Sequence, residues 1–322
     1  MTTEPTARPR QTRRGLQLQR LGAVAGLVVL IIGFAVSSPP FLQVNNLLNI
    51  ATQTSVIAII AIGQTYVIIT GGIDLSVGAI AALAGVLTAD LLRAEVPIPL
   101  AILVGLLGGT FVGALNGVLI AYGKIPPFIA TLGMLGITRG AVLVMTNGSP
   151  VSGLPRAFSW LGNGSVLGIP FPAVLMLVLC AVVGWVLLKS RFGRGVFAIG
   201  SNEKTAFLSG LHVPRIKIGV YAVSGLLSAI AGVILTSRLV SAAPTAGEGY
   251  ELDSIAATVI GGASLSGGVG GIGGTLIGAL VMGVLRNGLN LLGVSYYWQQ
   301  IAIGVVIIAA VWLDALRRRR TR

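Results

Sequence analysis

The chain has 322 residues, of which 54% are hydrophobic and only 10% are charged. A soluble globular domain carries about 25% charged residues, so this composition excludes a soluble protein and indicates an integral membrane protein. The net charge of +13 raises the question of a nucleic-acid partner, but no nucleic acid is expected, because the position of the charges along the chain explains them better as determinants of membrane topology.

Ten apolar segments are predicted to be transmembrane helices, because most of them approach the ~20 residues that a bilayer requires. They cover residues 21–36, 47–70, 75–92, 99–121, 127–145, 170–188, 216–238, 254–266, 272–292 and 298–315. The first is interpreted as an uncleaved helix rather than a signal peptide. The eighth is short and enters a glycine-rich run, so either a short or broken helix lies there or the count of spans is off by one. The predicted fold is an all-α integral membrane protein.

Basic residues gather in four polar segments, which hold 17 of the 22 lysines and arginines: 8–20, 124, 189–217 and 317–322. Ten crossings put all four segments on one side of the membrane, and the positive-inside rule makes that side cytoplasmic. Both termini are therefore predicted to be cytoplasmic. The predicted domains are an N-terminal tail (1–20), a transmembrane domain (21–316) with a cytoplasmic loop (190–217), and a basic C-terminal tail (317–322).

The cytoplasmic loop contains a short helix with signals at both ends. Ser201 and Asn202 can cap its start, and Gly210 can supply a left-handed exit. Pro214 then prevents continuation of the helix. A helix of roughly two turns is marginal in water by itself. Either the membrane domain or a partner must hold it, so we interpret it as a docking element.

The sequence lacks the residue sets of common enzyme sites. His212 is the only histidine, so neither a His-based triad nor a multi-histidine metal site is expected, and we predict no metal and no cofactor. No GxSxG, HExxH or GxxxxGK[ST] motif occurs, so the chain by itself is not expected to hydrolyse ATP. The run Gly268–Gly273 fits GxGxxG, but it lies between apolar spans, and a turn explains it better. Cys180 is the only cysteine, which excludes an intrachain disulfide.

Two glycine patterns stand out. The segment 99–121 repeats GxxxG three times, at positions 105, 109, 113 and 117. This stripe allows close helix packing, either within the chain or between subunits. The segments GGIDLSVG (71–78) and GGASLSGG (261–268) share GGxxLSxG. They are either a chance match or an internal repeat that marks paired helix breaks near a solute path.

Ionisable residues within or next to the predicted spans are few, and three of them have two interpretations each. Asp74 either caps the helix that follows it or takes part in gating or solute contact. Arg139 and Arg286 either serve a function inside the membrane or reach toward the interface. The acidic stretch 248–253 is predicted to be a solvated outer loop or a contact for an external protein.

Polar residues within the spans either line a path for a hydroxyl-rich solute or form hydrogen bonds between helices, which is the preferred interpretation for most of them. These residues are Asn46, Gln53, Gln64, Thr131, Asn287, Asn290, Gln299 and Gln300.

Four blocks of sequence carry a family resemblance: GGIDLSVG (71–78), PPFIATLGMLGITRG (126–140), GRGVFAIGSNEKTAFLSGL (193–211) and IAATVIGGASLSGGVGGIGGT (255–275). From about residue 20 to 315, the chain resembles the ribose/xylose/arabinose/galactose-type permease subunits of bacterial ABC importers. The resemblance implies a multi-pass protein of the cell (inner) membrane that translocates a monosaccharide, a pentose or a hexose, by alternating access. It also implies several partners: cytoplasmic ABC ATPase subunits, an extracytoplasmic sugar-binding protein, a second permease subunit, with a homodimer expected, and membrane lipid.

The resemblance also assigns roles to individual residues. The helix within 193–211 would be the coupling helix that inserts into a groove of the ATPase, with the residues Asn202, Glu203, Lys204, Ala206, Leu208, Ser209 and Gly210. The remaining motif residues mark the family and are candidates for the solute path: Gly71, Gly72, Asp74, Ser76, Gly78, Phe128, Thr131, Arg139, Gly261, Gly262, Ser264, Gly267 and Gly268.

Rival functions remain open at this point. A related ABC permease for nucleosides or branched-chain amino acids would share the architecture and differ in its solute. An ion-coupled secondary transporter would need paired acids at mid-membrane, for which only Asp74 is a candidate. An intramembrane enzyme would lack a catalytic base.

Overall fold

The computed structural model describes residues 13–320, and the described part is all-α, as predicted. It contains thirteen α-helices, one 3₁₀ helix (Arg156–Ser159) and a hairpin of two short strands, β1 (Ser165–Val166) and β2 (Ile169–Pro170). The helices are α1 (Arg13–Ser37), α2 (Val44–Ile69), α3 (Val77–Arg93), α4 (Ile98–Ala121), α5 (Pro127–Thr146), α6 (Trp160–Asn163), α7 (Phe171–Lys189), α8 (Arg191–Ser201), α9 (Glu203–Leu208), α10 (Val213–Leu239), α11 (Tyr250–Ile260), α12 (Ile272–Leu291) and α13 (Tyr296–Arg320).

Six of the described helices are long and apolar enough to cross a membrane: α2, α4, α5, α7, α10 and α12. Shorter apolar stretches occupy Leu21–Ser37 of α1 and Tyr296–Ala309 of α13. Each of the ten predicted apolar segments coincides with a helix, the other two being α3 and α11. Helix α1 begins inside the predicted N-terminal tail and α13 extends into the predicted C-terminal tail, while residues 1–12 and 321–322 of those tails lie outside the described residues.

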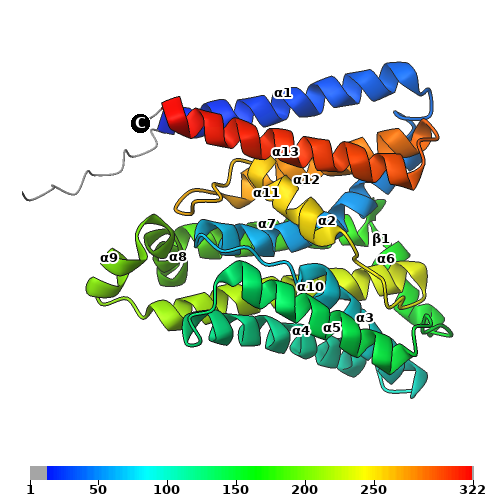
Figure 1. Cartoon of the computed structure of the whole chain (residues 1–322). Helices are drawn as coiled ribbons and strands as arrows, with labels where there is room; N and C mark the ends of the chain where they lie inside the picture. Colours follow the sequence, from blue (N-terminus) through cyan, green and yellow to red (C-terminus); the bar gives the residue numbers. More distant parts are fainter. Residues whose placement is uncertain (1–12, 321–322) are drawn as a thin grey trace, which may run out of the picture.

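Helix α2 forms the centre of the molecule. Every residue from 54 to 69 is buried, and the helix packs against α7, α10, α11 and α12. A helix that is apolar all around is expected to be enclosed, and α2 lies between the other helices in Figure 1. By contrast, only 22% of the most apolar stretch of α4 or of α7 is buried, so these helices present broad apolar surfaces outward.

The glycine stripe of α4 packs within the chain, as the first interpretation predicted. A methyl group on Gly113 would overlap the carbonyl oxygen of Tyr221 and lie 2.9 Å from the Cα of Gly225, both on α10. One on Gly105 would lie 2.7 Å from the carbonyl oxygen of Ala84 on α3. The stripe therefore lets the main chain of α4 approach its neighbours closely.

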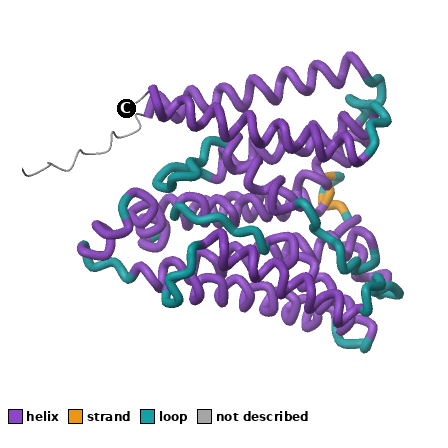
Figure 2. Tube along the Cα trace, viewed as in Figure 1, coloured by secondary structure: helices purple, strands orange, loops and turns teal. Residues whose placement is uncertain are grey.

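Two helices begin inside the bundle rather than at its ends. The loop 70–76 leaves α2 and runs through the interior before α3 starts (Figure 2). Helix α11 has only 11 residues and is followed by the loop 261–271, which confirms the predicted short or broken helix at this place. Discontinuous helices of this kind are common around the solute sites of transporters.

Candidate functional site

Helices α8 and α9 project together at one end of the bundle, the end at which α13 finishes (Figure 1). The start of α9 is capped by Asn202, whose Oδ1 accepts the N–H of Thr205 at 3.0 Å. Gly210 has the left-handed φ of 82° that was predicted for the exit. Ser201 does not cap α9; it ends α8, and its hydroxyl donates to the carbonyl of Phe197. The predicted short helix is thus confirmed, with Asn202 as its cap.

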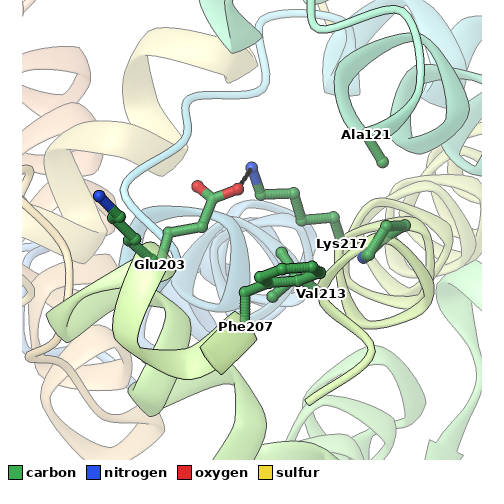
Figure 3. Close-up of a pocket in the computed structure, with 7 residues that line it drawn as sticks. Ala121, Glu203, Phe207, Val213 and Lys217 are labelled. Carbon is green, nitrogen blue, oxygen red and sulfur yellow. Dashed lines mark hydrogen bonds and ion pairs between the residues drawn. The ribbon is translucent and has the colours of Figure 1, made fainter. Parts of the chain in front are cut away.

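Two contacts hold α9 against the membrane domain. Ala206 is buried in a small apolar cluster with Ile199 of α8 and Val213 of α10. The carboxylate of Glu203 accepts a bond from Lys217 Nζ at 2.7 Å (Figure 3). Because the Glu203 side chain is 55% exposed, this ion pair contributes only about 0–1 kcal/mol to stability. It orients α9 more than it stabilises the fold.

The outer surface of α9 is apolar although it faces away from the bundle. Phe207 and Leu208 are 66% and 74% exposed. Beside them lies an open groove of about 440 Å³, which we call the α9 groove (Figure 3). Its lining is Ala121, Glu203, Lys204, Phe207, Val213, Pro214 and Lys217. Exposed apolar residues next to such a groove indicate a docking surface. Phe207 was not among the predicted coupling residues, although it lies between two residues that were, Ala206 and Leu208.

The last turn of α8 contacts the interior of the bundle through main-chain atoms. The N–H of Gly268 donates to the carbonyl of Ile69, the last residue of α2, at 2.8 Å. Gly200 lies against the same two groups so closely that a methyl group there would overlap the Ile69 oxygen. We call this meeting of α2, α8 and the loop 261–271 the glycine junction. It brings the two GGxxLSxG segments together next to the docking helix.

A buried polar cluster lies where α3 begins. Asp74, which is fully buried, accepts the N–H and the hydroxyl of Ser76 at 3.0 and 2.6 Å and the hydroxyl of Ser224 at 2.9 Å. Asn116 donates to the Ser76 hydroxyl at 2.8 Å. We call these four residues the polar centre. The N-cap residue of α3 is Ser76, so Asp74 does not cap the helix as predicted. It instead holds Ser76 in place and joins the start of α3 to α10.

Helix α5 supports both interior loops. The hydroxyl of Thr131 donates to the carbonyl of Ile73, next to Asp74, at 3.1 Å. Arg139 donates to the carbonyls of Pro244 and Ala246 at 2.6 and 3.0 Å. Arg139 thus holds the loop before α11. Phe128, at the start of α5, is 49% exposed and is not part of the polar centre.

The motif glycines fit tight main-chain contacts. Gly72 lies against the hydroxyl of Tyr221, and Gly78 lies against the carbonyl of Gly247, just before α11. The starts of α3 and α11, which both lie inside the bundle, therefore meet. Gly71 has a positive φ of 81°.

The second motif segment closes its own loop. Gly261 packs directly on Gly274 of α12, and the N–H of Ser264 donates to the carbonyl of Val269 at 3.0 Å. Positive φ angles occur at Gly262, Gly267 and Gly268.

Hydrogen bonds between helices, the preferred interpretation, are formed by four of the eight predicted polar residues, Asn46, Asn287, Asn290 and Gln299. Most hydroxyls within the helices instead donate to a carbonyl of their own helix. Asn46 and Asn287 exchange two hydrogen bonds of 3.0 and 2.9 Å, and Thr65 contacts Thr275 at 2.7 Å. Gln64 differs, because it is fully buried and neither polar atom of its amide has a partner among the described residues.

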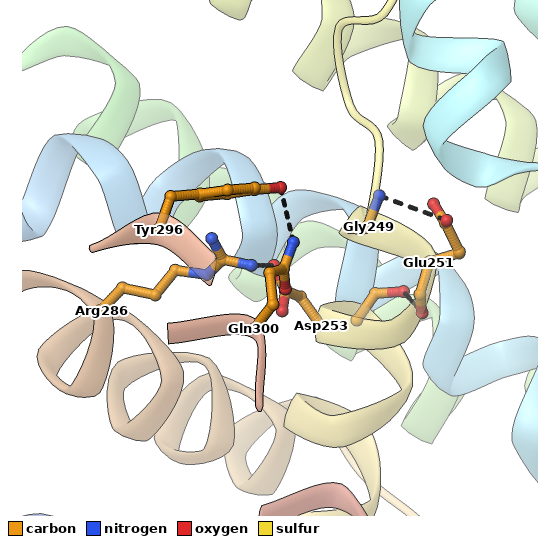
Figure 4. A network of polar contacts seen from close by, with 7 residues as sticks. Gly249, Glu251, Asp253, Arg286, Tyr296 and Gln300 are labelled. Carbon is orange, nitrogen blue, oxygen red and sulfur yellow. Dashed lines mark hydrogen bonds and ion pairs between the residues drawn. The ribbon is translucent and has the colours of Figure 1, made fainter. Parts of the chain in front are cut away.

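The prediction of a solvated acidic loop at 248–253 is wrong for its second half. Glu248 is exposed, but helix α11 begins at Tyr250, and Asp253 is fully buried. Asp253 binds Arg286 Nη2 at 2.6 Å (Figure 4). A charge at this depth must be paired, and Arg286 supplies the partner instead of reaching the interface. Sequence reasoning had named both residues without pairing them.

Comparison with known proteins places this architecture in a family. The profile of the family described as branched-chain amino acid transport system / permease component matches residues 46–311. The chain belongs to this family of permease components. It is 53% identical over 300 residues to the ribose import permease protein of Bacillus subtilis, with 92% of this chain and 93% of that one covered. It is 48% identical to the ribose import permease protein of Escherichia coli, with 98% and 99% covered.

More distant relatives carry other names. The D-allose transport system permease protein of Escherichia coli is 41% identical over 91% of this chain and 90% of its own. No solved structure matches the chain. The resemblance seen in the sequence is thus confirmed, and this chain is a multi-pass membrane permease rather than an enzyme.

Proposed function

We propose that this permease is the membrane-spanning subunit of an ATP-driven ABC importer for a monosaccharide. ATP hydrolysis would take place in a separate cytoplasmic ATPase, and an extracytoplasmic sugar-binding protein would deliver the solute. Relatives named as permeases for ribose, allose and arabinose cover most of the chain. D-ribose is therefore the first solute to test, because the ribose permeases share the higher identities of 48–53%.

The observation that carries this proposal is the docking surface of α9. A six-residue helix is capped, held to α10 and presents Phe207 and Leu208 outward, where neither residue serves the fold. Such a surface gains its free energy only when a partner covers it. In this proposal, α9 is the coupling helix, its partner is the ATPase, and its end of the bundle is cytoplasmic. The basic segment at the end of α13 lies at the same end (Figure 1), in keeping with the positive-inside rule.

The same proposal extends to the membrane topology. The six long helices together with α1, α3, α11 and α13 would cross the membrane ten times and leave both termini in the cytoplasm. Two of these ten helices, α3 and α11, begin inside the bundle. Two such subunits would enclose the solute path, and a homodimer is the simplest assembly.

The glycine junction provides the mechanical link in this scheme. Movement of α8 and α9 by the ATPase acts on the inner end of α2 and on the loop before α12 at once, since Gly268 is bonded to Ile69. Alternating access would follow as these segments shift between two arrangements, whose populations the partners change by binding one better than the other.

A pull-down of the detergent-solubilised permease with a candidate ABC ATPase tests the docking surface. The double variant Phe207→Ser, Leu208→Ser is expected to lose at least about tenfold in ATPase binding, because removing two exposed apolar anchors costs more than the 1.4 kcal/mol of one decade. The matched control is Leu167→Ser, a residue that is 98% exposed in the hairpin turn at the other end of the bundle. This variant is expected to bind normally.

Equal binding by the wild type and the double variant would refute the assignment of α9. A wild-type permease that binds no ATPase would favour an ion-coupled transporter instead. If the importer took up a nucleoside or a branched-chain amino acid but no monosaccharide, the proposed solute class would be wrong. The proposed architecture would still hold.

Glu203 gives a second test of the same surface. Glu203→Arg replaces the ion pair with Lys217 by a repulsion at the rim of the α9 groove. Because the original pair is exposed, the thermal stability of the solubilised permease should change little, whereas uptake should fall severalfold. Glu203→Gln, which removes the pair without reversing the charge, should retain most of the uptake. A large loss of thermal stability in the Arg variant would show that the pair serves the fold instead.

A further inference from the structure

The Asp253–Arg286 pair is incompletely satisfied although it is buried. Asp253 uses Oδ2 for the bond to Arg286 Nη2, and its Oδ1 is buried with no partner among the described residues. The Nε of Arg286 is likewise buried and has no partner there. Unpaired buried atoms of charged groups are costly. If the pair served only to join α11 to α12, leaving these two atoms without partners would cost free energy and bring no benefit.

The surroundings of the pair open gradually toward the surface. The side chain of Asp253 is fully buried and that of Arg286 is 19% exposed, whereas Tyr296, at the start of α13, is 53% exposed. Gln300 donates to the Tyr296 hydroxyl, and both side chains converge on the ion pair (Figure 4). An aromatic ring, an amide, a guanidinium and a carboxylate thus gather between the first turn of α11 and the start of α13 (Figure 4).

The free atoms define the chemistry of a ligand. Asp253 Oδ1 can only accept a hydrogen bond, and Arg286 Nε–H can only donate one. A hydroxyl group does both, so a hydroxyl can satisfy either of the two atoms. Hydrogen bonds to charged groups are about twice as strong as those between neutral groups. An apolar solute would leave both atoms unpaired, and an inorganic ion could satisfy only one of them.

We propose that Asp253 and Arg286, beneath Tyr296 and Gln300, form a binding site for the hydroxyl groups of the transported solute in the outer half of the permease. This inference rests on the proposed function, because it assumes a polyhydroxylated solute. The site receives the sugar after its release from the binding protein, before the solute path changes access. It is separate from the polar centre at the start of α3.

The test uses the complete importer in proteoliposomes, with permease, ATPase and binding protein, and measures radiolabelled D-ribose transported per ATP hydrolysed. The variant is Asp253→Asn, Arg286→Gln, which removes both charges together and leaves an amide pair able to join the helices. We expect its transport per ATP to fall by about tenfold. Its ATPase rate stimulated by the binding protein should stay within about twofold of the wild type.

The matched control is the double variant Asn46→Leu, Asn287→Leu. It removes a neighbouring polar pair between α2 and α12 in which each amide is bonded to the other. Transport per ATP should be close to that of the wild type.

Three outcomes would overturn the inference. Equal transport per ATP in the site variant and the wild type would mean that water alone occupies the free atoms. An equal loss in the control would mean that helix packing accounts for the effect. Wild-type vesicles that hydrolyse ATP but move no D-ribose, D-allose or L-arabinose would refute the proposed function, and this inference with it.

Discussion

Replacing Gly113 by leucine is expected to reduce the yield of folded permease by about tenfold or more. The new side chain would meet the main chain of α10 at Tyr221 and Gly225, and main-chain atoms cannot move aside without separating the two helices. Overpacking of a close contact costs roughly 1–3 kcal/mol or more, and about 1.4 kcal/mol is one decade. The measurement is the monodisperse fraction after detergent extraction and size-exclusion chromatography.

Gly133→Leu is the matched control. Gly133 is also a helical glycine in a membrane-spanning helix, but a Cβ atom at this position of α5 would meet nothing within 4 Å. Its folded yield should equal that of the wild type. A Gly113→Leu variant that folds and transports normally would show that α4 and α10 separate easily, and the intrachain role of the stripe would then have to be abandoned.

The second large effect is expected for Asp74→Ala. This change leaves the Ser76 N–H and the Ser224 hydroxyl without their acceptor in a fully buried place, at about 1–3 kcal/mol for each orphaned group. The start of α3 would lose its link to α10. We expect a clear drop in the melting temperature of the solubilised permease and near-complete loss of uptake.

The melting temperature and the uptake of Asp74→Asn should lie between those of the alanine variant and the wild type, because an amide keeps one acceptor oxygen. Asp90→Ala, near the other end of α3, is the control. Asp90 is half-buried and its carboxylate accepts no hydrogen bond from the described residues, because only its main-chain carbonyl accepts one, from Ala94. The melting temperature of Asp90→Ala should therefore remain that of the wild type. Unchanged stability of Asp74→Ala would instead leave solute contact or gating as the role of the carboxylate.

The sequence predicted much of the fold, since hydrophobic length is the dominant signal in a bilayer. Every predicted apolar segment overlaps a helix, although the eighth, predicted over 254–266, is helical only as far as Ile260 in α11. The docking helix was also predictable, since Asn202 and Gly210 are local signals that need no tertiary contact. The pattern of glycines on α4 predicted close packing correctly, but it could not show that α10 is the helix against which Gly113 packs.

The long-range pairs could not be predicted in the same way. Asp253 and Arg286 are 33 residues apart, and an acid near Glu248 and Glu251 resembles part of a solvated loop when only local sequence is considered. The polar centre likewise depends on Ser224, which lies 150 residues from Asp74. Serine within an apolar segment is too common to signal a contact of this kind. Such pairs become visible only when the packing of helices is known.

The glycine junction has a consequence for how such a permease can diversify. The bond from Gly268 to Ile69 joins two main chains, and Gly200 fits against them because it has no side chain. No rotamer intervenes between the docking helices and the inner end of α2, so substitutions that change which solute is accepted leave this link untouched. If α8 and α9 couple to an ATPase as proposed, one mechanical drive would serve many solutes, and these two glycine positions would tolerate almost no replacement.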